Sequence, residues 1–203
     1  MNLLQTFPHQ DPIAKAVYVG VIACWFIFAG VFLARRRPPR HEETRRDRLS
    51  MLGIFFQALA YAAVWTLRRQ LFAPIVSMPV VVEIGVGMAT IGIAAGSIWL
   101  VMSAVRTLGK QWALAARLVE GHQLITGGPY RWVRNPIYTG MFGMMIATGL
   151  AISHWIAFPP ALVLFAIGTV IRVRSEEKLL RKAFGQEFED YAHRVPAVLP
   201  GIY

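Results

Sequence analysis

The chain has 203 residues, of which 56% are hydrophobic and only 16% are charged, and its mean hydropathy is +0.47. Soluble domains carry about 25% charged residues, so this composition excludes a disordered chain, a nucleic-acid-binding tail and an ordinary water-soluble enzyme. Cys24 is the single cysteine, which excludes a disulfide framework and a cysteine-based zinc site, and we expect no metal centre. The net charge of +10 could indicate nucleic acid as a partner, so its meaning depends on where the charges lie.

Four long stretches without Asp, Glu, Lys or Arg predict an all-α, polytopic membrane protein. The first three, 16–34, 49–67 and 84–105, contain 19, 19 and 22 residues. Each suits one crossing, because a helix needs about 20 apolar residues to span the hydrocarbon. The fourth, 137–171, has 35 residues and is interrupted by polar and proline residues within 153–160. We interpret it as a tight helical hairpin, which brings the number of transmembrane helices to about five.

The basic residues are concentrated in three segments that would share one side of the membrane. With five crossings, 35–48, 106–136 and 172–203 lie together and hold 18 of the 21 Lys and Arg residues. Cytoplasmic loops carry such an excess, so we expect the N-terminus outside and the C-terminus in the cytoplasm. The same segments would face anionic lipid headgroups, which explains the net charge without nucleic acid.

The cytoplasmic segment before the hairpin contains two turn signals. The first is Gly127–Pro129, and the second is Asn135-Pro136, where the proline suits the first turn of the next helix. The N–H groups and positive dipole end of that helix favour an anionic ligand group. We expect the side chains of Tyr130 and Tyr138 to converge on the N-terminus of this helix. Singly, such aromatic residues also suit an interfacial belt at the headgroups.

The cytoplasmic tail predicts an amphipathic helix that continues from the last crossing, because its apolar residues fall at helical spacing. These residues are Leu180, Phe184, Phe188 and Tyr191. Glu176 and Glu177 lie beside this stripe, four positions from Arg172 and Arg181, so intrahelical ion pairs are one interpretation. A functional role is the other, because carboxylates where a helix leaves the bilayer carry a desolvation cost. The hairpin should bring Glu177 close to Asn135.

Two motifs resemble those of a known family. Residues 128–140, Gly-Pro-Tyr-Arg-Trp-Val-Arg-Asn-Pro-Ile-Tyr-Thr-Gly, resemble the G-x-Y-x-x-x-R-H-P-x-Y-x-G motif of the isoprenylcysteine carboxyl methyltransferase family. The wider phospholipid methyltransferase group shares a related R-H-P element. About 40 residues later the family has a Glu pair, F-G-x-E-[YF]-x-x-Y and R-V-P, and an H-x-L-[VI]-T stretch comes earlier. The corresponding segments here are 176–177, 184–191, 194–196 and 122–126.

The resemblance covers residues 105–203 and implies an integral membrane enzyme that uses S-adenosylmethionine. It implies one set of cofactor contacts: His122, Gln123, Leu124, Ile125, Tyr130, Asn135, Pro136, Ile137, Tyr138 and Glu177. Arg134 joins this set because, with exposed N–H groups, it suits the methionine carboxylate of the cofactor. The sulfonium suits the ring faces of Tyr130 and Tyr138, and the ribose and amino groups suit Glu177.

The chain departs from the family pattern at two positions. The family's motif His is Asn135 here, which can form hydrogen bonds but does not titrate near neutral pH. The family's substrate-binding Arg, four residues before the second Glu, is replaced by Val173, with Arg172 and Arg174 on either side. These two arginines point about 200° apart on a helix, so we expect only one of them to reach the substrate.

The expected reaction is direct methyl transfer to a lipophilic or prenylated acceptor that enters from the bilayer. A carboxylate is already ionised at pH 7, and a thiolate would likewise need no base, whereas an amine would need one, for which Glu176 is the candidate. We expect one membrane domain over 1–203, with three transmembrane helices in 1–105 and the catalytic half in 106–203. An NADPH-dependent membrane reductase and a non-enzymatic scaffold are the alternatives, and nothing in the sequence indicates an oligomeric state.

Overall fold

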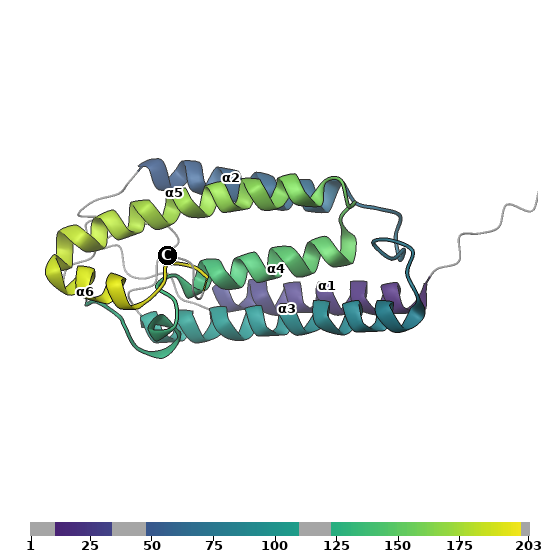
Figure 1. Ribbon diagram of the computed structural model, residues 1–203, viewed down its shortest axis with the longest axis horizontal. Helices are drawn as coiled ribbons and strands as arrows, with labels where there is room; N and C mark the ends of the chain where they lie inside the picture. The colour runs from purple at the N-terminus through teal and green to yellow at the C-terminus, as the bar shows by residue number, and fades with distance from the viewer. Residues whose placement is uncertain (1–10, 34–47, 110–122, 200–203) are drawn as a thin grey trace, which may run out of the picture.

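The computed structural model describes residues 11–33, 48–109 and 123–199, and its regular elements are all helices (Figure 1). They are α1 (Pro12–Leu33), α2 (Arg48–Thr66), α3 (Val80–Leu108), the 3₁₀ helix η2 (Gly128–Arg131), α4 (Pro136–Ile152), α5 (Phe158–Phe184) and α6 (Gln186–Arg194). The expected all-α class is confirmed. Residues 35–47 of the first basic segment and residues 110–122 of the segment before the hairpin, which include His122, lie outside the described residues.

Four of the described helices, α1, α2, α3 and α5, are long and apolar enough to cross a membrane. The multi-pass character predicted from the charge-free stretches is therefore supported. The first half of the expected hairpin is α4, which is apolar but has only 17 residues. A total of five crossings depends on counting α4 and remains a prediction.

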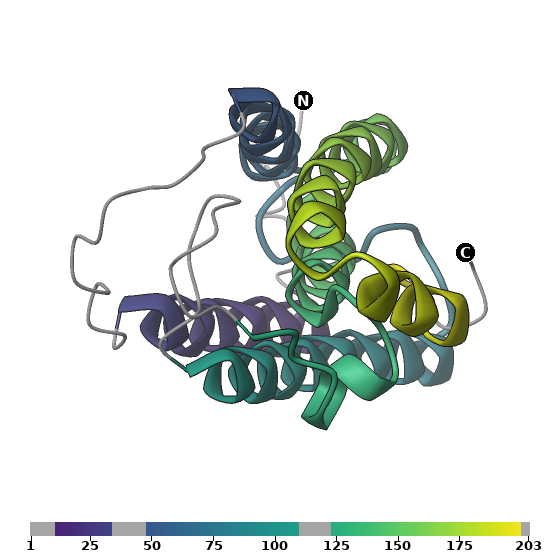
Figure 2. The ribbon, with the colours of Figure 1, turned by 90° about the vertical axis from the view of Figure 1, so that its left-hand side faces the viewer.

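The helices form two layers with α4 between them. Figures 1 and 2 show α5 beside α2 on one side and α1 beside α3 on the other. The turn of the hairpin, residues 153–157, is tight as expected, but the two helices diverge from it. Packing of α4 is mainly on α3, and packing of α5 is mainly on α2. The hairpin therefore joins the two layers, and α4 is shielded by its neighbours.

Small residues explain how α4 approaches α3 so closely. A Cβ atom on Gly140 would lie 2.9 Å from the backbone oxygen of Ser97. One on Gly143 would overlap the hydroxyl oxygen of the same serine. Without side chains at these two positions the helices pack almost backbone to backbone, which is the usual role of small residues between helices in lipid.

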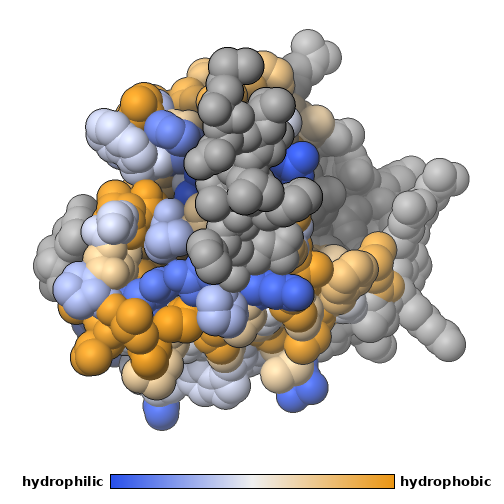
Figure 3. Space-filling view, turned by 90° about the vertical axis from the view of Figure 1, so that its right-hand side faces the viewer, coloured by the Kyte–Doolittle hydropathy of each residue, from blue (hydrophilic) through white to orange (hydrophobic). Residues whose placement is uncertain are grey.

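Arg69 caps the end of α4 at the side of the molecule that carries the hairpin turn. Its Nη2 donates to the backbone oxygens of Leu150 and Ala151 at 2.8 Å each, and its Nη1 donates to that of Ser153 at 2.9 Å. Burial lowers the pKa of Arg69 to about 10, which still leaves it charged at neutral pH. Figure 3 shows this end of the molecule, where hydrophilic and hydrophobic residues are interspersed.

Two glycines fix the contact between α2 and α5. A Cβ atom on Gly168 would lie 2.7 Å from the backbone oxygen of Gly53 and 3.0 Å from the backbone nitrogen of Gln57. Real Cβ atoms do not approach a backbone this closely, so a side chain at Gly168 would push the helices apart. The position of α5 along α2 therefore depends on this glycine.

Replacement of Gly168 with alanine should destabilise the protein by about 1–3 kcal/mol, as overpacked cores do. The matched control is Gly92→Ala in α3, where an added Cβ meets nothing within 4 Å. Thermal unfolding of the two variants in the same detergent measures the difference. We expect a lower midpoint for Gly168→Ala and an unchanged or higher one for Gly92→Ala, and equal midpoints would contradict the α2–α5 contact.

The C-terminal helix differs from the expected continuous one. Gly185 has a φ of 51°, a left-handed value that suits glycine, and there α5 ends and the chain turns into α6. The turn buries Phe188 and Tyr191 against Leu180, Phe184 and the loop residue Leu124. The apolar stripe found in the sequence thus packs on the loop before α4, whereas its contact with a membrane surface remains a prediction.

Candidate active site

The loop that precedes α4 is held against the end of α3. Gly128 has a φ of 59°, and a Cβ atom on it would lie 2.7 Å from the hydroxyl oxygen of Thr107. Glycine is thus required twice here, once for backbone conformation and once for space. The 3₁₀ helix η2, which begins at Gly128, buries Tyr130, and Tyr130 lines a pocket together with residues of α5 and α6.

The C-terminal tail pairs with the start of α4. The backbone N–H of Arg134 donates to the carbonyl of Pro196 at 2.8 Å, and both the backbone N–H and the side-chain amide of Asn135 donate to Ala197 at 3.0 Å. The Arg-Asn-Pro motif and the Arg-Val-Pro motif are therefore in contact. The tail thus accepts from the backbone N–H groups of Arg134 and Asn135, and the expectation that the N–H groups of the following helix favour an anionic ligand group stays a prediction.

Arg134 connects three segments through its side chain. Its Nε donates to Glu177 on α5 at 2.9 Å, and its Nη1 donates to the carbonyl of Ala192 at 2.6 Å and to that of Val195. Both side chains of the Arg134–Glu177 pair are about nine-tenths buried, with exposures of 10% and 9%. Arg181, four residues further along α5, lies 3.4 Å from the other oxygen of Glu177. The predicted proximity of loop and glutamate is confirmed.

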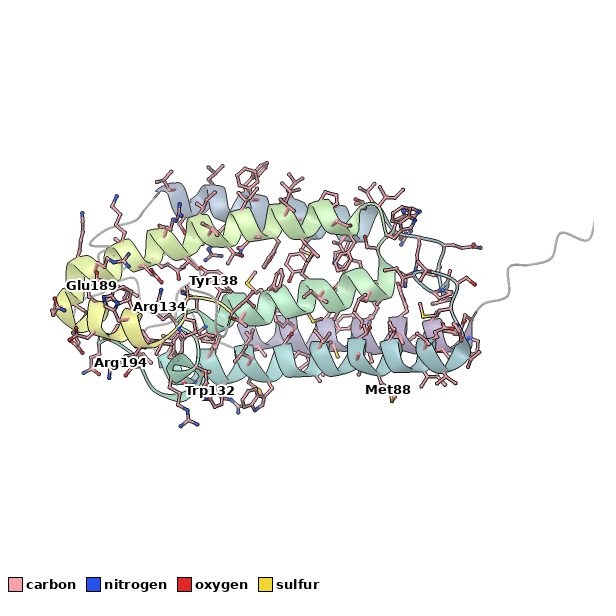
Figure 4. The ribbon with its side chains drawn as sticks, in the orientation of Figure 1. Met88, Trp132, Arg134, Tyr138, Glu189 and Arg194 are labelled. Carbon is pink, nitrogen blue, oxygen red and sulfur yellow. The ribbon has the colours of Figure 1, made fainter. Side chains whose placement is uncertain are left out.

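A second cluster lies where α4 faces α5. The Tyr138 hydroxyl donates to the carboxylate of Glu176, and the guanidinium carbon of Arg172 lies 4.8 Å from the centre of the Tyr138 ring. The Nη2 of Arg172 is 3.7 Å from the same carboxylate. Figure 4 shows Arg134 and Tyr138 at the end of the molecule that carries α6. Both i,i+4 pairs predicted for α5, Arg172–Glu176 and Glu177–Arg181, exist. Glu176 also binds Tyr138, and Glu177 also binds Arg134, both from the loop motif.

The two candidate arginines have different environments. Arg172 is buried, with 6% of its surface exposed, and it carries the contacts to Tyr138 and Glu176. Arg174 is exposed, as the 200° offset on a helix requires. The structure therefore brings Arg172 to the cluster and does not bring Arg174 there.

A pocket opens between the loop, α3, α5 and α6, and it contains about 420 Å³ of space between atoms, including its opening. Seven residues expected to bind the cofactor line it: Gln123, Leu124, Ile125, Tyr130, Arg134, Asn135 and Glu177. Pro136, Ile137 and Tyr138 follow in the chain and are not among the lining residues, and His122 lies outside the described residues. The pocket therefore collects most of the expected set from two motifs that are 40 residues apart.

The remaining lining residues are Leu108, Leu180, Phe188 and Tyr191, which the sequence analysis did not assign to a site. Three of them belong to the apolar stripe of the tail, so their periodicity was visible but suggested only a helix face. Leu108 ends α3 and has no sequence signal of its own. All four provide apolar surface, which suits a ligand with an aromatic part.

Two buried tyrosines of the pocket wall, Tyr130 and Tyr191, are joined by a hydrogen bond. The hydroxyl of Tyr191 donates to the backbone oxygen of Tyr130 at 2.6 Å. Burial, and secondarily the charge of Glu176, raises the pKa of Tyr130, and burial is also the main reason that the pKa of Tyr191 is raised. Both phenols therefore keep their protons at neutral pH, and that of Tyr191 acts as a hydrogen-bond donor.

The family model for phospholipid methyltransferases matches residues 82–187, which is half of the chain. The chain belongs to this family. The matched region includes the loop, α4 and both glutamates, whereas α1 and α2 lie before it. The family resemblance that the motifs of the sequence indicated is thereby confirmed.

Curated relatives include methyltransferases from plants and mammals. A probable protein-S-isoprenylcysteine O-methyltransferase of Oryza sativa is 36% identical over 104 residues, which cover 49% of this chain and 53% of the relative. The corresponding protein of Mus musculus is 38% identical over 87 residues, which cover 41% and 29%. The nickel-cobalt-cadmium resistance protein NccN of Alcaligenes xylosoxydans xylosoxydans is 37% identical over 98 residues, covering 47% and 45%. The chain thus spans about half or less of the length of these relatives.

Proposed function

We propose that the protein transfers a methyl group from S-adenosylmethionine to a lipophilic acceptor, and that the reacting group of this acceptor is a carboxylate. The observation that supports this most is the convergence of the two motifs. Arg134 and Tyr138 of the first motif bind Glu177 and Glu176 of the second, beside a pocket lined by seven expected cofactor residues. Relatives named as isoprenylcysteine O-methyltransferases agree with a carboxylate acceptor.

The pocket residues have the chemistry that S-adenosylmethionine needs. Leu108, Leu124, Leu180 and Phe188 offer apolar walls for the adenine. Glu177, whose position is fixed by Arg134, has carboxylate lone pairs for the ribose hydroxyls and the amino group. The phenol of Tyr130 presents a donor and a ring face for the sulfonium. When bound, the cofactor supplies an electrophilic methyl group.

The cluster beside the pocket would orient the acceptor. Arg172 provides a buried positive charge that suits a carboxylate, and it would share this charge with Glu176, which accepts from Tyr138 and lies 3.7 Å from Arg172. Since a carboxylate is ionised at neutral pH, no proton has to move before attack, which agrees with Asn135 in place of the family's His. Positioning of the two reacting groups would then account for most of the rate enhancement.

The acceptor would reach the cluster from the bilayer, while the cofactor would enter from the cytoplasmic side. The orientation with the N-terminus outside follows from the basic residues, and it places α6 and the pocket in the cytoplasm. A prenylated cysteine is one such acceptor, since the prenyl chain partitions into lipid. A thiol acceptor is compatible with the same arrangement, and an amine would require Glu176 as a base.

The test is a calorimetric titration of the detergent-solubilised protein with S-adenosylmethionine and, separately, with NADPH. We expect binding of the first and none of the second. Binding of NADPH alone would indicate a reductase. Binding of neither ligand would indicate a scaffold. Either result would refute the proposal. Mass spectrometry of lipids incubated with an isotopically labelled methyl donor would then identify the acceptor.

Tyr130→Ala should abolish measurable binding of S-adenosylmethionine, because it removes both the ring face and a wall of the pocket. The matched control is Tyr18→Ala in α1, which removes a ring that packs on Phe72, away from the pocket. The same titration measures both variants. Unchanged affinity of the Tyr130 variant would refute its assignment to the cofactor.

A further inference from the structure

Helix α2 lies outside the region matched by the family model, yet it presents polar groups to α5. Ser50, Gly53 and Gln57 fall on one face, at helical spacing. Ser50 is fully buried and Gln57 is 3% exposed. A buried amide or hydroxyl in a membrane helix is costly unless it has a partner, so these two side chains need an explanation beyond packing.

Gln57 forms hydrogen bonds to two residues of α5. Its Nε2 donates to the hydroxyl of Thr169 at 3.0 Å, and its Oε1 accepts from Nη1 of Arg172 at 3.3 Å. The amide therefore connects the guanidinium to a fixed point one turn earlier on α5. A side-chain amide with one donor and one acceptor bond of this kind restricts the rotation of Arg172.

The backbone of α2 at Gly53 also restrains Arg172. A Cβ atom on Gly53 would lie 2.5 Å from Cγ of Arg172, so the aliphatic part of the arginine lies directly on the backbone of α2. On the opposite side, the guanidinium carbon is 4.8 Å from the centre of the Tyr138 ring. Arg172 is thus held between α2 and α4, which leaves few orientations for its charge.

Ser50 carries a hydroxyl for which no hydrogen-bond partner exists among the described residues. The contacts of Gly53 with Arg172, and of Gln57 with Thr169, show that α2 and α5 run antiparallel. Ser50, one turn before Gly53, therefore faces the turn of α5 that begins at Arg172. A buried hydroxyl without a partner, one turn from the glycine that contacts the buried Arg172, matches the needs of an anion that accepts hydrogen bonds from both.

We propose that α2 completes the acceptor site: the Ser50 hydroxyl donates to the anionic group of the acceptor at Arg172, and Gln57 is a positioning residue that holds the guanidinium. The inference rests on the proposed function and names its acceptor class as a lipophilic carboxylate. The acceptor and Glu176 would share Arg172, since the Glu176 carboxylate accepts from Tyr138 and lies 3.7 Å from the guanidinium, an ion-pair distance longer than a hydrogen bond.

The test compares two ligands that differ only in charge. N-acetyl-S-farnesylcysteine carries the carboxylate, and its carboxamide is the neutral counterpart. Affinities of both are measured for the full-length protein in lipid nanodiscs, with and without S-adenosylhomocysteine. The ratio of the two affinities reports recognition of the anion, and it is insensitive to a general loss of folded protein.

The wild-type protein should prefer the carboxylate, and Ser50→Ala and Gln57→Leu should each reduce this preference about tenfold, as expected for a hydrogen bond to a charged group. Gln57→Glu should reduce it further, because the new carboxylate competes for Arg172. In both Gln57 variants KM for the acceptor should rise more than kcat falls. The matched control is Ser97→Ala, a buried serine of α3 whose hydroxyl bonds within its own helix, and it should keep the preference.

The outcomes separate this inference from the proposed function. If the wild-type protein binds S-adenosylmethionine and methylates the probe while Ser50→Ala and Gln57→Leu keep the full preference, only the inference is overturned. If the protein fails to bind S-adenosylmethionine, the proposed function is refuted, and the ligand ratio without cofactor still decides the inference. A wild-type protein without preference for the carboxylate also overturns it.

Discussion

Arg134→Leu should abolish binding of S-adenosylmethionine and lower the free energy of unfolding by about 3–5 kcal/mol, the usual result of removing one partner of a buried ion pair. The variant leaves Glu177 buried without the donor at 2.9 Å. It also removes the donor to the carbonyls of Ala192 and Val195, so the side-chain link between α5 and these two carbonyls is lost while the backbone bonds of residues 134 and 135 to the tail remain. Calorimetric titration and thermal unfolding measure the two effects.

The control for this prediction is Arg131→Leu, three residues earlier in the same loop. Arg131 is exposed and lies over the ring of Trp132, 4.8 Å from its centre, so its loss should change neither binding nor stability by much. Arg134→Lys should give an intermediate result, since an ammonium cannot reproduce the separate Nε and Nη1 bonds. Wild-type affinity in Arg134→Leu would show that the pocket does not depend on this connection.

A double variant separates the two effects. Arg134→Leu combined with Glu177→Leu removes both charges, so no unpaired carboxylate remains buried. Stability should recover relative to the single variant, because paired burial of two charges adds little net stability. Cofactor binding should stay absent, since the carboxylate that lines the pocket is gone.

Arg172→Gln should reduce kcat/KM for N-acetyl-S-farnesylcysteine at least about 100-fold, the loss expected when a charge-assisted bond to the substrate is removed. Arg174→Gln should change it less than about twofold, as surface substitutions away from a site do. The two arginines are two positions apart on α5, but Arg172 is buried against Tyr138 and Arg174 is exposed. Steady-state assays with a labelled methyl donor measure both variants.

Affinity for S-adenosylmethionine is the control in this comparison. Arg172 does not line the pocket, so its substitution should leave this affinity within about twofold of wild type while activity falls. Equal activities of the two variants would refute the assignment of the acceptor charge to Arg172. A loss in Arg174→Gln alone would instead assign it to the exposed arginine.

The sequence was sufficient to predict the class and the course of the chain. Runs without charge have the length that the bilayer imposes, so α1, α2 and α3 could be located within a few residues, and Pro159 and Pro160 revealed the hairpin. The two motifs identified the family, and the hairpin geometry predicted that Glu177 lies near the loop. These features depend on local composition and on helix length, which the sequence contains directly.

Only the tertiary structure decided how the site is held together. The sequence suggested that Arg134 binds an anionic ligand group, whereas in the structure its side chain binds Glu177, and the backbone N–H groups of Arg134 and Asn135 bind the tail at Pro196 and Ala197. It could not choose between Arg172 and Arg174, nor assign any role to Ser50 and Gln57. The physical reason is that these outcomes depend on which distant segment packs on each helix face. Helical periodicity identifies a face, but it does not identify the partner of that face.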